Sequence, residues 1–225
     1  MDENLENALI RELMQFPAYW DGKKTILEMK SYGSHNWKQM EWFGFYFQEL
    51  CERRLKKIGM HTPGTRYGMA EFDGNFDGFD WDFKAHCVED QSGTAKNIVI
   101  CNDLEATELT LDRHGKTGLI IANGVATYDN PETMEFKKWV KALSGGVDSA
   151  YVQENIRRGA RSRLRKTSFT VKSIDVYILD EETIEKQLIR SGDFQKGMRN
   201  SNGNPRRSKF QLNLSEVKPY FTVKL

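Results

Sequence analysis

Residues 79–86 constrain the fold more than any other part of the chain, because apolar and polar side chains alternate there without a break. A period of two is typical of a β-strand whose two faces meet different surroundings. One face would carry Phe79, Trp81, Phe83 and Ala85 into a core. The opposite face would carry Asp80, Asp82, Lys84 and His86. The pattern therefore predicts a buried strand that presents two carboxylates, an amine and an imidazole in a line.

Two acids crowded on one strand face indicate a function rather than a purely structural role. A divalent cation with oxygen ligands relieves their mutual repulsion, and a lysine beside them can hold and polarise a water molecule. Asp73 precedes a Gly-Asn pair that we expect to turn the chain, so that a hairpin brings Asp73 across to Asp82. Asp77 and Asp80 compete with Asp73 for the role of the first acid.

Asp73 followed by Asp82-Phe83-Lys84 resembles the signature of the PD-(D/E)XK nucleases, which have an acid at the end of one strand and acid-x-lysine on the next. This superfamily includes most type II restriction endonucleases. The resemblance covers roughly residues 40–130, and it departs from the family at one point, because no proline precedes Asp73. It implies an α/β fold with a central mixed β-sheet flanked by helices, as in restriction endonucleases.

The resemblance also implies a magnesium-dependent mechanism. Asp73, Asp82 and the carbonyl of Phe83 would bind one or two Mg²⁺ ions, and Lys84 would position the attacking water. The products would be a 5′-phosphate and a 3′-hydroxyl. Further candidate metal ligands are Asp80 and a helical glutamate, for which Glu41 and Glu49 remain alternatives.

Charge is unevenly distributed along the chain. Residues 1–149 contain 17 Lys+Arg and 24 Asp+Glu, whereas residues 150–225 contain 16 and 8. An acidic pocket can recruit metal and a basic surface can recruit a polyanion. We therefore expect one nuclease domain over residues 1–225, with a catalytic core at about 37–130 and a basic DNA-recognition part at about 144–210.

Two basic segments supply the candidate DNA contacts. Residues 150–166 are predicted to form an amphipathic helix, and six cations with no acid lie within its last ten residues. Residues 195–209 form a loop whose arginines and amides could read base edges. A solvated helix face and a plain loop are the alternatives. The candidates are Arg157, Arg158, Arg161, Arg163 and Arg165 on the helix, and Lys196, Arg199, Asn202, Arg206 and Arg207 in the loop.

The string Ser-Gly-Gly-Val-Asp-Ser at 144–149 matches the phosphate loop of ATP pyrophosphatases. We reject that function because the string follows a segment of helical periodicity, and the 76 residues after it are too few for the rest of that fold. A simpler interpretation is a joint between helices with Asp148 or Ser149 as N-cap. In a nuclease, Ser144 and Ser149 could instead hold a DNA phosphate.

The remaining segments predict a mixed α/β order. We expect helices at 3–16, 37–58 and 131–143, and strands at 69–72, 79–88, 98–101, 118–122, 125–128 and 169–179. Gly59 would close the second helix, and Asn123-Gly124 is predicted to form a hairpin turn. There is no apolar run long enough for a membrane span, and the three cysteines have no CxxC spacing, so we expect a cytoplasmic protein.

The sequence thus predicts a type II restriction endonuclease that cuts double-stranded DNA at a palindromic site. A homodimer is the simplest way to cut both strands of a palindrome. One alternative is a repair or junction-resolving nuclease of the same fold. Another is a DNA-binding protein whose acid cluster is inert.

Overall fold

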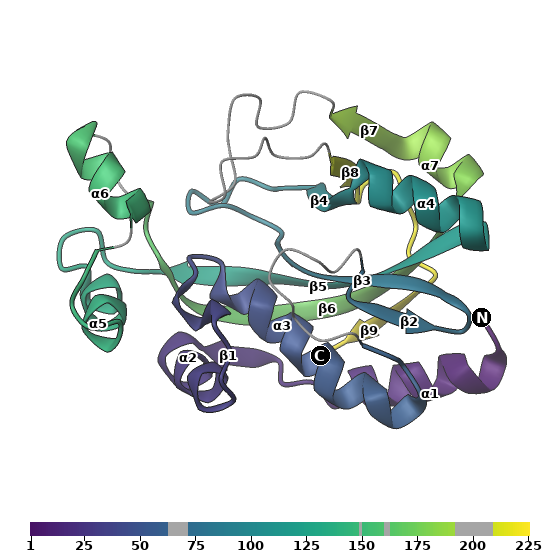
Figure 1. Ribbon diagram of the computed structural model, residues 1–225, viewed down its shortest axis with the longest axis horizontal. Coiled ribbons are helices and arrows are strands. Elements are labelled where there is room, and N and C mark those ends of the chain that lie inside the picture. Colours follow the sequence, from purple (N-terminus) through teal and green to yellow (C-terminus); the bar gives the residue numbers. More distant parts are fainter. Residues whose placement is uncertain (63–71, 149, 160–162, 192–208) are drawn as a thin grey trace.

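The structure is a computed structural model that describes residues 1–62, 72–148, 150–159, 163–191 and 209–225. Within these residues two β-sheets are stacked, and helices cover the outer face of the larger sheet (Figure 1). No helix in the described part of the chain has both the length and the apolar character needed to cross a membrane. The chain is a mixed α/β fold in which the larger sheet is flanked by helices, as predicted.

The larger sheet has the strand order β1-β6-β5-β3-β2, and β9 pairs with another part of β6. Strands β3 and β5 are parallel and the other pairs are antiparallel, so the sheet is mixed. Its strands are β1 (Tyr19–Asp21), β2 (Gly74–Phe76), β3 (Phe79–Cys87), β5 (Lys116–Tyr128), β6 (Lys166–Asp180) and β9 (Phe221–Lys224).

The smaller sheet lies over one face of the larger one and has the order β4-β8-β7 (Figure 1). Its strands are β4 (Ile98–Asp103), β7 (Leu188–Ser191) and β8 (Lys209–Asn213). The connection between the parallel strands β3 and β5 passes through β4 and α4 (Leu104–His114), and α7 (Glu181–Gln187) leads from β6 to β7. Leu119, Ile121 and Tyr177 of the large sheet share a core with Val99 and Phe210 of the small one.

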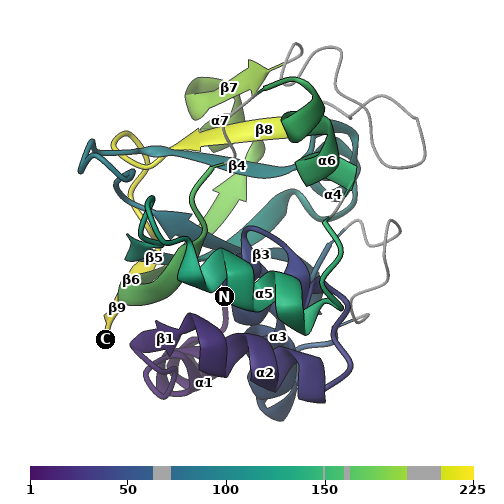
Figure 2. The same cartoon turned by 90° about the vertical axis from the view of Figure 1, so that its left-hand side faces the viewer.

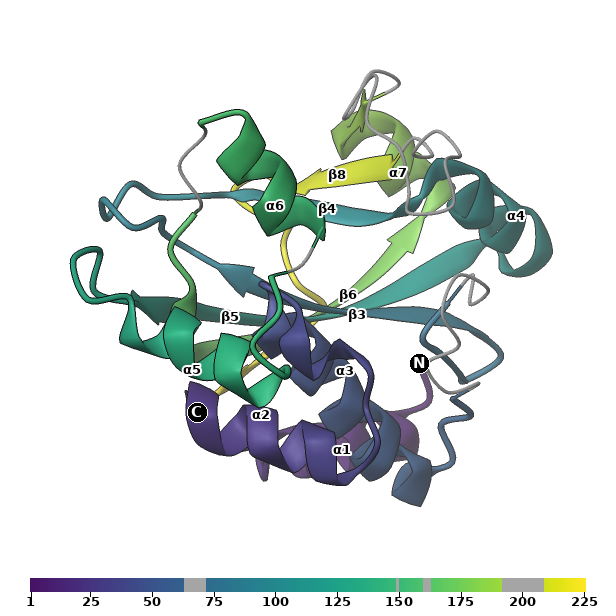
Figure 3. The same cartoon turned by 60° about the vertical axis from the view of Figure 1, so that its left-hand side comes forward.

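The opposite face of the large sheet is covered by α1 (Glu3–Leu13), α2 (Gly22–Ser31) and α3 (Trp42–Leu55), as Figure 2 shows. The core on this side is rich in aromatic rings, and the larger ones are Trp20, Trp42, Phe47, Phe79, Trp81 and Phe169. Strand β3 therefore has a packed layer on each side. Two further helices, α5 (Glu135–Leu143) and α6 (Ala150–Arg157), lie toward one end of the molecule (Figure 3).

The hairpin predicted at Asn123-Gly124 is wrong. Strand β5 continues through both residues and carries a bulge there against β6. The glycine serves close packing rather than a turn, because a Cβ atom on Gly124 would lie 2.3 Å from the carbonyl oxygen of Thr170. A hairpin signal based on residue type alone cannot distinguish these two uses of glycine.

The turn between β2 and β3 lies later than predicted. Residues 74 and 75 belong to β2, and the turn is made by Asp77 and Gly78, whose φ angles are 54° and 78°. Two consecutive residues with positive φ match the tight turns that fit the twist of antiparallel strands. Most of the strand predicted at 69–72 lies outside the described residues.

The predicted helices are also shorter than expected. The 37–58 segment divides into two 3-10 turns, Asn36–Lys38 and Lys56–Ile58, with α3 between them, and Gly59 ends it at a φ of 88°. Helix α6 ends at Arg157, and Gly159 follows with a φ of 64°. The predicted helix at 150–166 is therefore wrong at residues 158, 159 and 163–166, and its residues 160–162 lie outside the described residues.

We expect Gly124→Ala to destabilise the protein by about 1–3 kcal/mol, because the added methyl group overlaps the backbone of β6. Gly44→Ala is the matched control: it lies in α3 with no atom within 4 Å of the added Cβ, and it should stabilise by up to about 1 kcal/mol. Urea unfolding of both variants measures the effect. Equal stability of the two would contradict a close approach of β5 and β6.

Candidate active site

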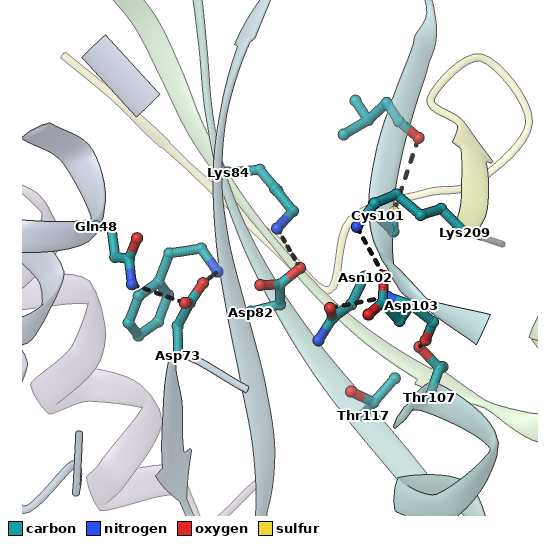
Figure 4. A network of polar contacts seen from close by, with 12 residues as sticks. Gln48, Asp73, Asp82, Lys84, Cys101, Asn102, Asp103, Thr107, Thr117 and Lys209 are labelled. Carbon is teal, nitrogen blue, oxygen red and sulfur yellow. Dashed lines mark hydrogen bonds and ion pairs between the residues drawn. The ribbon is translucent and has the colours of Figure 1, made fainter. Parts of the chain in front are cut away.

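Strand β3 carries the acid and the lysine on the face that turns toward the small sheet (Figure 4). Asp82 is 3% exposed, so its carboxylate is nearly withdrawn from water. The Nζ atom of Lys84 lies 2.6 Å from its Oδ2 atom. The side chain of Lys84 is 28% exposed to solvent, so the ion pair lies at the boundary between the packed layers and solvent.

Asp73 is fixed beside this pair by three hydrogen bonds. Its backbone N–H donates to the carbonyl of Trp81 at 3.0 Å, and its Oδ2 atom accepts from the N–H of Phe83 at 2.8 Å. Its Oδ1 atom accepts from the side-chain amide of Gln48 on α3 at 2.8 Å. Trp81 and Phe83, the partners in the first two hydrogen bonds, flank Asp82 in the strand. The carboxylates of Asp73 and Asp82 are therefore neighbours.

The backbone of Phe83 adds a further oxygen to this edge. In an extended strand the N–H and C=O groups of one residue point to the same side. Because the N–H of Phe83 binds Asp73, its carbonyl faces the edge on which Asp73 lies. Of the described strands, β2 pairs with β3 only along residues 79–81, so it does not cover this carbonyl.

The charges of this site act strongly on one another. Burial raises the pKa of Asp73 well above its usual range, and the neighbouring Asp82 raises it further, against the opposing effects of Lys84 and of the Phe83 N–H. Burial by itself would lower the pKa of Lys84, but Asp82 and Asp73 outweigh it and raise that pKa. Lys84 is therefore a cation at neutral pH, suited to hold a water molecule or a phosphate rather than to accept a proton.

The donor set fits a hard divalent cation. Two carboxylates and a backbone carbonyl are oxygen ligands of the kind that Mg²⁺ prefers, and Mg²⁺ usually retains several waters as well. The repulsion that raises the pKa of Asp73 is the repulsion that a cation would remove. In the described residues no group of three or more His, Cys, Asp or Glu side chains gathers as a metal site. An ion held by Asp73 and Asp82 would thus keep coordination positions open for water and substrate.

The two competing acids point elsewhere. Asp80 accepts hydrogen bonds from Asn75 at 3.0 Å and from Thr110 at 2.8 Å, so it ties β3 to β2 and α4. Asp77 occupies the hairpin turn, and its carboxylate lies 3.8 Å from the amino terminus. Of the three candidates for the first acid, the structure brings Asp73 to Asp82.

The helical residue nearest the acids is an amide. Gln48 contacts Asp73, whereas Glu41 pairs with Lys166 and Glu49 lies beside Ser34 and Arg53. The Gln48 amide also donates to Glu52 at 3.2 Å, one helical turn away. Sequence reasoning missed Gln48 because it considered only glutamates as helical partners of a metal.

The small sheet contributes residues to the same region. Asp82 lines a small cavity together with Cys101 and Asn102 from the β4 strand and with Thr107 and Thr117. Cys101 and Asn102 come to Asp82 through the packing of β4 over the large sheet, whereas Thr117 lies on β5, the strand that pairs with β3 (Figure 4). No motif in the sequence could have indicated this.

The described arginine candidates have two kinds of surroundings. Arg157, the last residue of α6, and Arg158, directly after it, are exposed, and both pair with Glu154. Arg163 follows the helix, and 71% of its side chain is exposed. Arg165 instead donates to the carbonyls at 38 and 39, and burial lowers its pKa, so it has a structural role. Arg161, Ser149, Lys196, Arg199, Asn202, Arg206 and Arg207 lie outside the described residues.

The glycine string at 144–149 acts as a helix end in the residues that are described. Gly145 and Gly146 have φ angles of 87° and 79°, and the N–H of Gly146 donates to the carbonyl of Lys141 in α5. The Ser144 hydroxyl donates to the carbonyl of Val140 at 2.8 Å. These contacts account for the positive φ angles of the two glycines as the end of α5.

Comparison of the chain with protein-family models, with characterised proteins and with solved structures gave no match.

The raised pKa of Asp73 predicts a pH-dependent stability in metal-free buffer. The folded protein keeps a proton that the unfolded chain releases, so this stabilising contribution is complete at acidic pH and is lost as the pH rises through the raised pKa. With EDTA present, we expect the free energy of unfolding to fall over this window in the wild type and to fall less in Asp73→Asn. Asp77→Asn is the control and should follow the wild type. Identical pH profiles for wild type and Asp73→Asn would contradict the assigned repulsion.

A divalent cation should reverse this loss. At a Mg²⁺ or Mn²⁺ concentration of about 100 times the Kd, binding to the folded state stabilises by about 2.7 kcal/mol. Thermal melts near pH 8 should show this gain for the wild type and for Asp77→Asn, but not for Asp73→Asn or Asp82→Asn. A gain of the same size in all four proteins would place the ion elsewhere.

Proposed function

We propose that the chain is a magnesium-dependent DNA endonuclease whose active site consists of Asp73, Asp82 and Lys84. The observation that carries the proposal is the placement of two neighbouring carboxylates and a cationic lysine at one edge of β3, with Asp73 held by Gln48 and Phe83. A structural strand gains nothing from this repulsion, whereas hydrolysis of a phosphodiester uses each group.

The residues divide the chemistry among them. Asp73, Asp82 and the Phe83 carbonyl would hold Mg²⁺, which supplies Lewis-acid activation of the phosphate and neutralises developing charge. Lys84, kept protonated by the acids, would orient the water whose oxygen attacks phosphorus. The bond between phosphorus and the 3′ oxygen breaks, and the products are a 5′-phosphate and a 3′-hydroxyl. Gln48 holds Asp73 in place through this reaction.

The finer proposal is a type II restriction endonuclease that acts on double-stranded DNA as a homodimer. Each chain supplies one pair of neighbouring acids, so two cuts in a palindrome would use two copies. The basic excess after residue 150 and the exposed Arg157, Arg158 and Arg163 support a polyanionic substrate. Digestion of a sequenced plasmid with Mg²⁺, beside an EDTA control, tests this. Discrete fragments support a restriction enzyme, and cleavage confined to branched or damaged DNA would support a repair or junction-resolving nuclease.

We expect Lys84→Ala to lower the cleavage rate by on the order of a hundredfold or more, because it removes the group that positions the nucleophile. Asp82→Asn should eliminate Mg²⁺-dependent cleavage, and Asp77→Asn, the same chemical change in the hairpin turn, should be mild. Plasmid nicking rates measure all three, and filter binding should show that Lys84→Ala still binds DNA.

Lys84→Ala also removes the partner of a buried carboxylate, so its melting temperature must be recorded with its activity. Lys84→Met, which keeps the apolar stem, provides a second variant with the same loss of charge. If either folded variant cuts within about tenfold of the wild type, the catalytic assignment is wrong.

A further inference from the structure

A second lysine approaches the active site from the small sheet. Lys209 is the first residue of β8 and pairs in register with Asp103 at the end of β4. Its Nζ atom lies 2.9 Å from the Oδ1 atom of Asp103, and 33% of its side chain is exposed. Figure 4 shows Lys209 beside Cys101 and Asp103, with its amine directed toward the region of Asp82 and Lys84.

Lys209 and the catalytic pair share one region, because Asp82 lines a small cavity with Cys101, Asn102 and Phe210, the neighbour of Lys209 (Figure 4). Burial raises the pKa of Cys101 to about 12, Asp82 raises it too, and Lys84 and Lys209 both oppose the rise. One buried atom thus responds to the catalytic acid and to both amines. Lys84 belongs to the large sheet and Lys209 to the small one, so two partly exposed cations border the space between the sheets from opposite sides.

Asp103 holds the amine of Lys209 in this position. It is the N-cap residue of α4, where an aspartate usually accepts a hydrogen bond from the first turn, yet its side chain makes no such cap bond. The carboxylate is directed to Lys209 instead. An ammonium group has three N–H donors, and among the described residues Asp103 is the acceptor for it. A partly exposed ion pair of this kind contributes little to stability.

We propose that Lys209 binds a phosphate of the DNA backbone at the active site, opposite Lys84. This inference rests on the proposed nuclease function and assigns a substrate-binding residue to the small sheet. Lys209 would hold the sugar–phosphate chain from the side of the small sheet, while Lys84 and the carboxylates act on the scissile bond from the side of β3.

Two variants separate this role from a structural one. Lys209→Met and Asp103→Asn break the same ion pair, but only the first removes the cation. Filter binding of linearised plasmid DNA in EDTA, over a series of salt concentrations, gives the affinity and its salt slope. Lys209→Met should weaken binding about three- to tenfold and reduce the log–log slope by roughly 0.9, the value for one lost phosphate contact. Asp103→Asn should keep the slope and the affinity, or bind more tightly.

The controls address folding and charge. Lys224→Met removes a lysine from β9, which pairs with β6 and is separated from β3 by β6 and β5. This variant should leave the slope unchanged. Lys209→Arg should restore most of the affinity, since it keeps the charge. With Mg²⁺, Lys209→Met should raise the KM for cleavage more than it lowers kcat. Melting temperatures of all variants show whether each is folded.

The outcomes distinguish this inference from the proposed function. An unchanged slope in Lys209→Met, or an equal loss of binding in Asp103→Asn, overturns the phosphate contact even if the wild type cuts DNA. A reduced slope in a protein that never cuts DNA supports the contact and overturns the nuclease. Absence of DNA binding by the wild type overturns both.

Discussion

The opposition of Asp73 and Asp82 at the edge of β3 is the interaction on which the rest of the site depends. Asp82 is nearly fully buried, and burial together with Asp82 raises the pKa of Asp73. Such an arrangement persists only where the surrounding structure fixes it. Here the fixing groups are the Phe83 N–H, the Gln48 amide and the Lys84 ammonium. The Phe83 N–H and the Lys84 ammonium favour the ionised form of Asp73, and they oppose the burial and the repulsion from Asp82 that raise its pKa.

The two-layer packing explains how one short strand can supply this site. Its aromatic side chains fill the core under α1–α3, so its backbone is held firmly. Its polar side chains face the space beneath the small sheet, where Cys101, Asn102 and Thr107 approach Asp82. His86, further along the same face, is within 2.8 Å of the Lys96 carbonyl through its Nε2 atom, and burial lowers its pKa, so it serves the packing of the 88–96 segment. The polar groups of this face that we propose as catalytic are therefore Asp82 and Lys84.

Local pattern was sufficient for the parts of the fold that depend on neighbours in sequence. The period-two alternation predicted β3 and its polar face, and the helical periodicity predicted α1 and α3. Strand β4 was predicted at 98–101. Its place in a separate small sheet, α4 and the bulge at Asn123-Gly124 were missed, because each depends on contacts between distant segments. The same distinction applies to the site. The spacing of Asp73, Asp82 and Lys84 was enough to predict them from the sequence. Gln48 and Lys209 could be identified only from the structure, which places α3 and β8 near β3.

The position of a bound ion tests the central claim most directly. Crystals of the protein soaked with Mn²⁺, a close substitute for Mg²⁺ with anomalous scattering, would locate the ion without reliance on activity. The account predicts a peak at the edge of β3, within about 2.0–2.6 Å of carboxylate oxygens of Asp73 and Asp82 and of the Phe83 carbonyl. A fully occupied ion at other residues, with these two carboxylates left without metal, would contradict it.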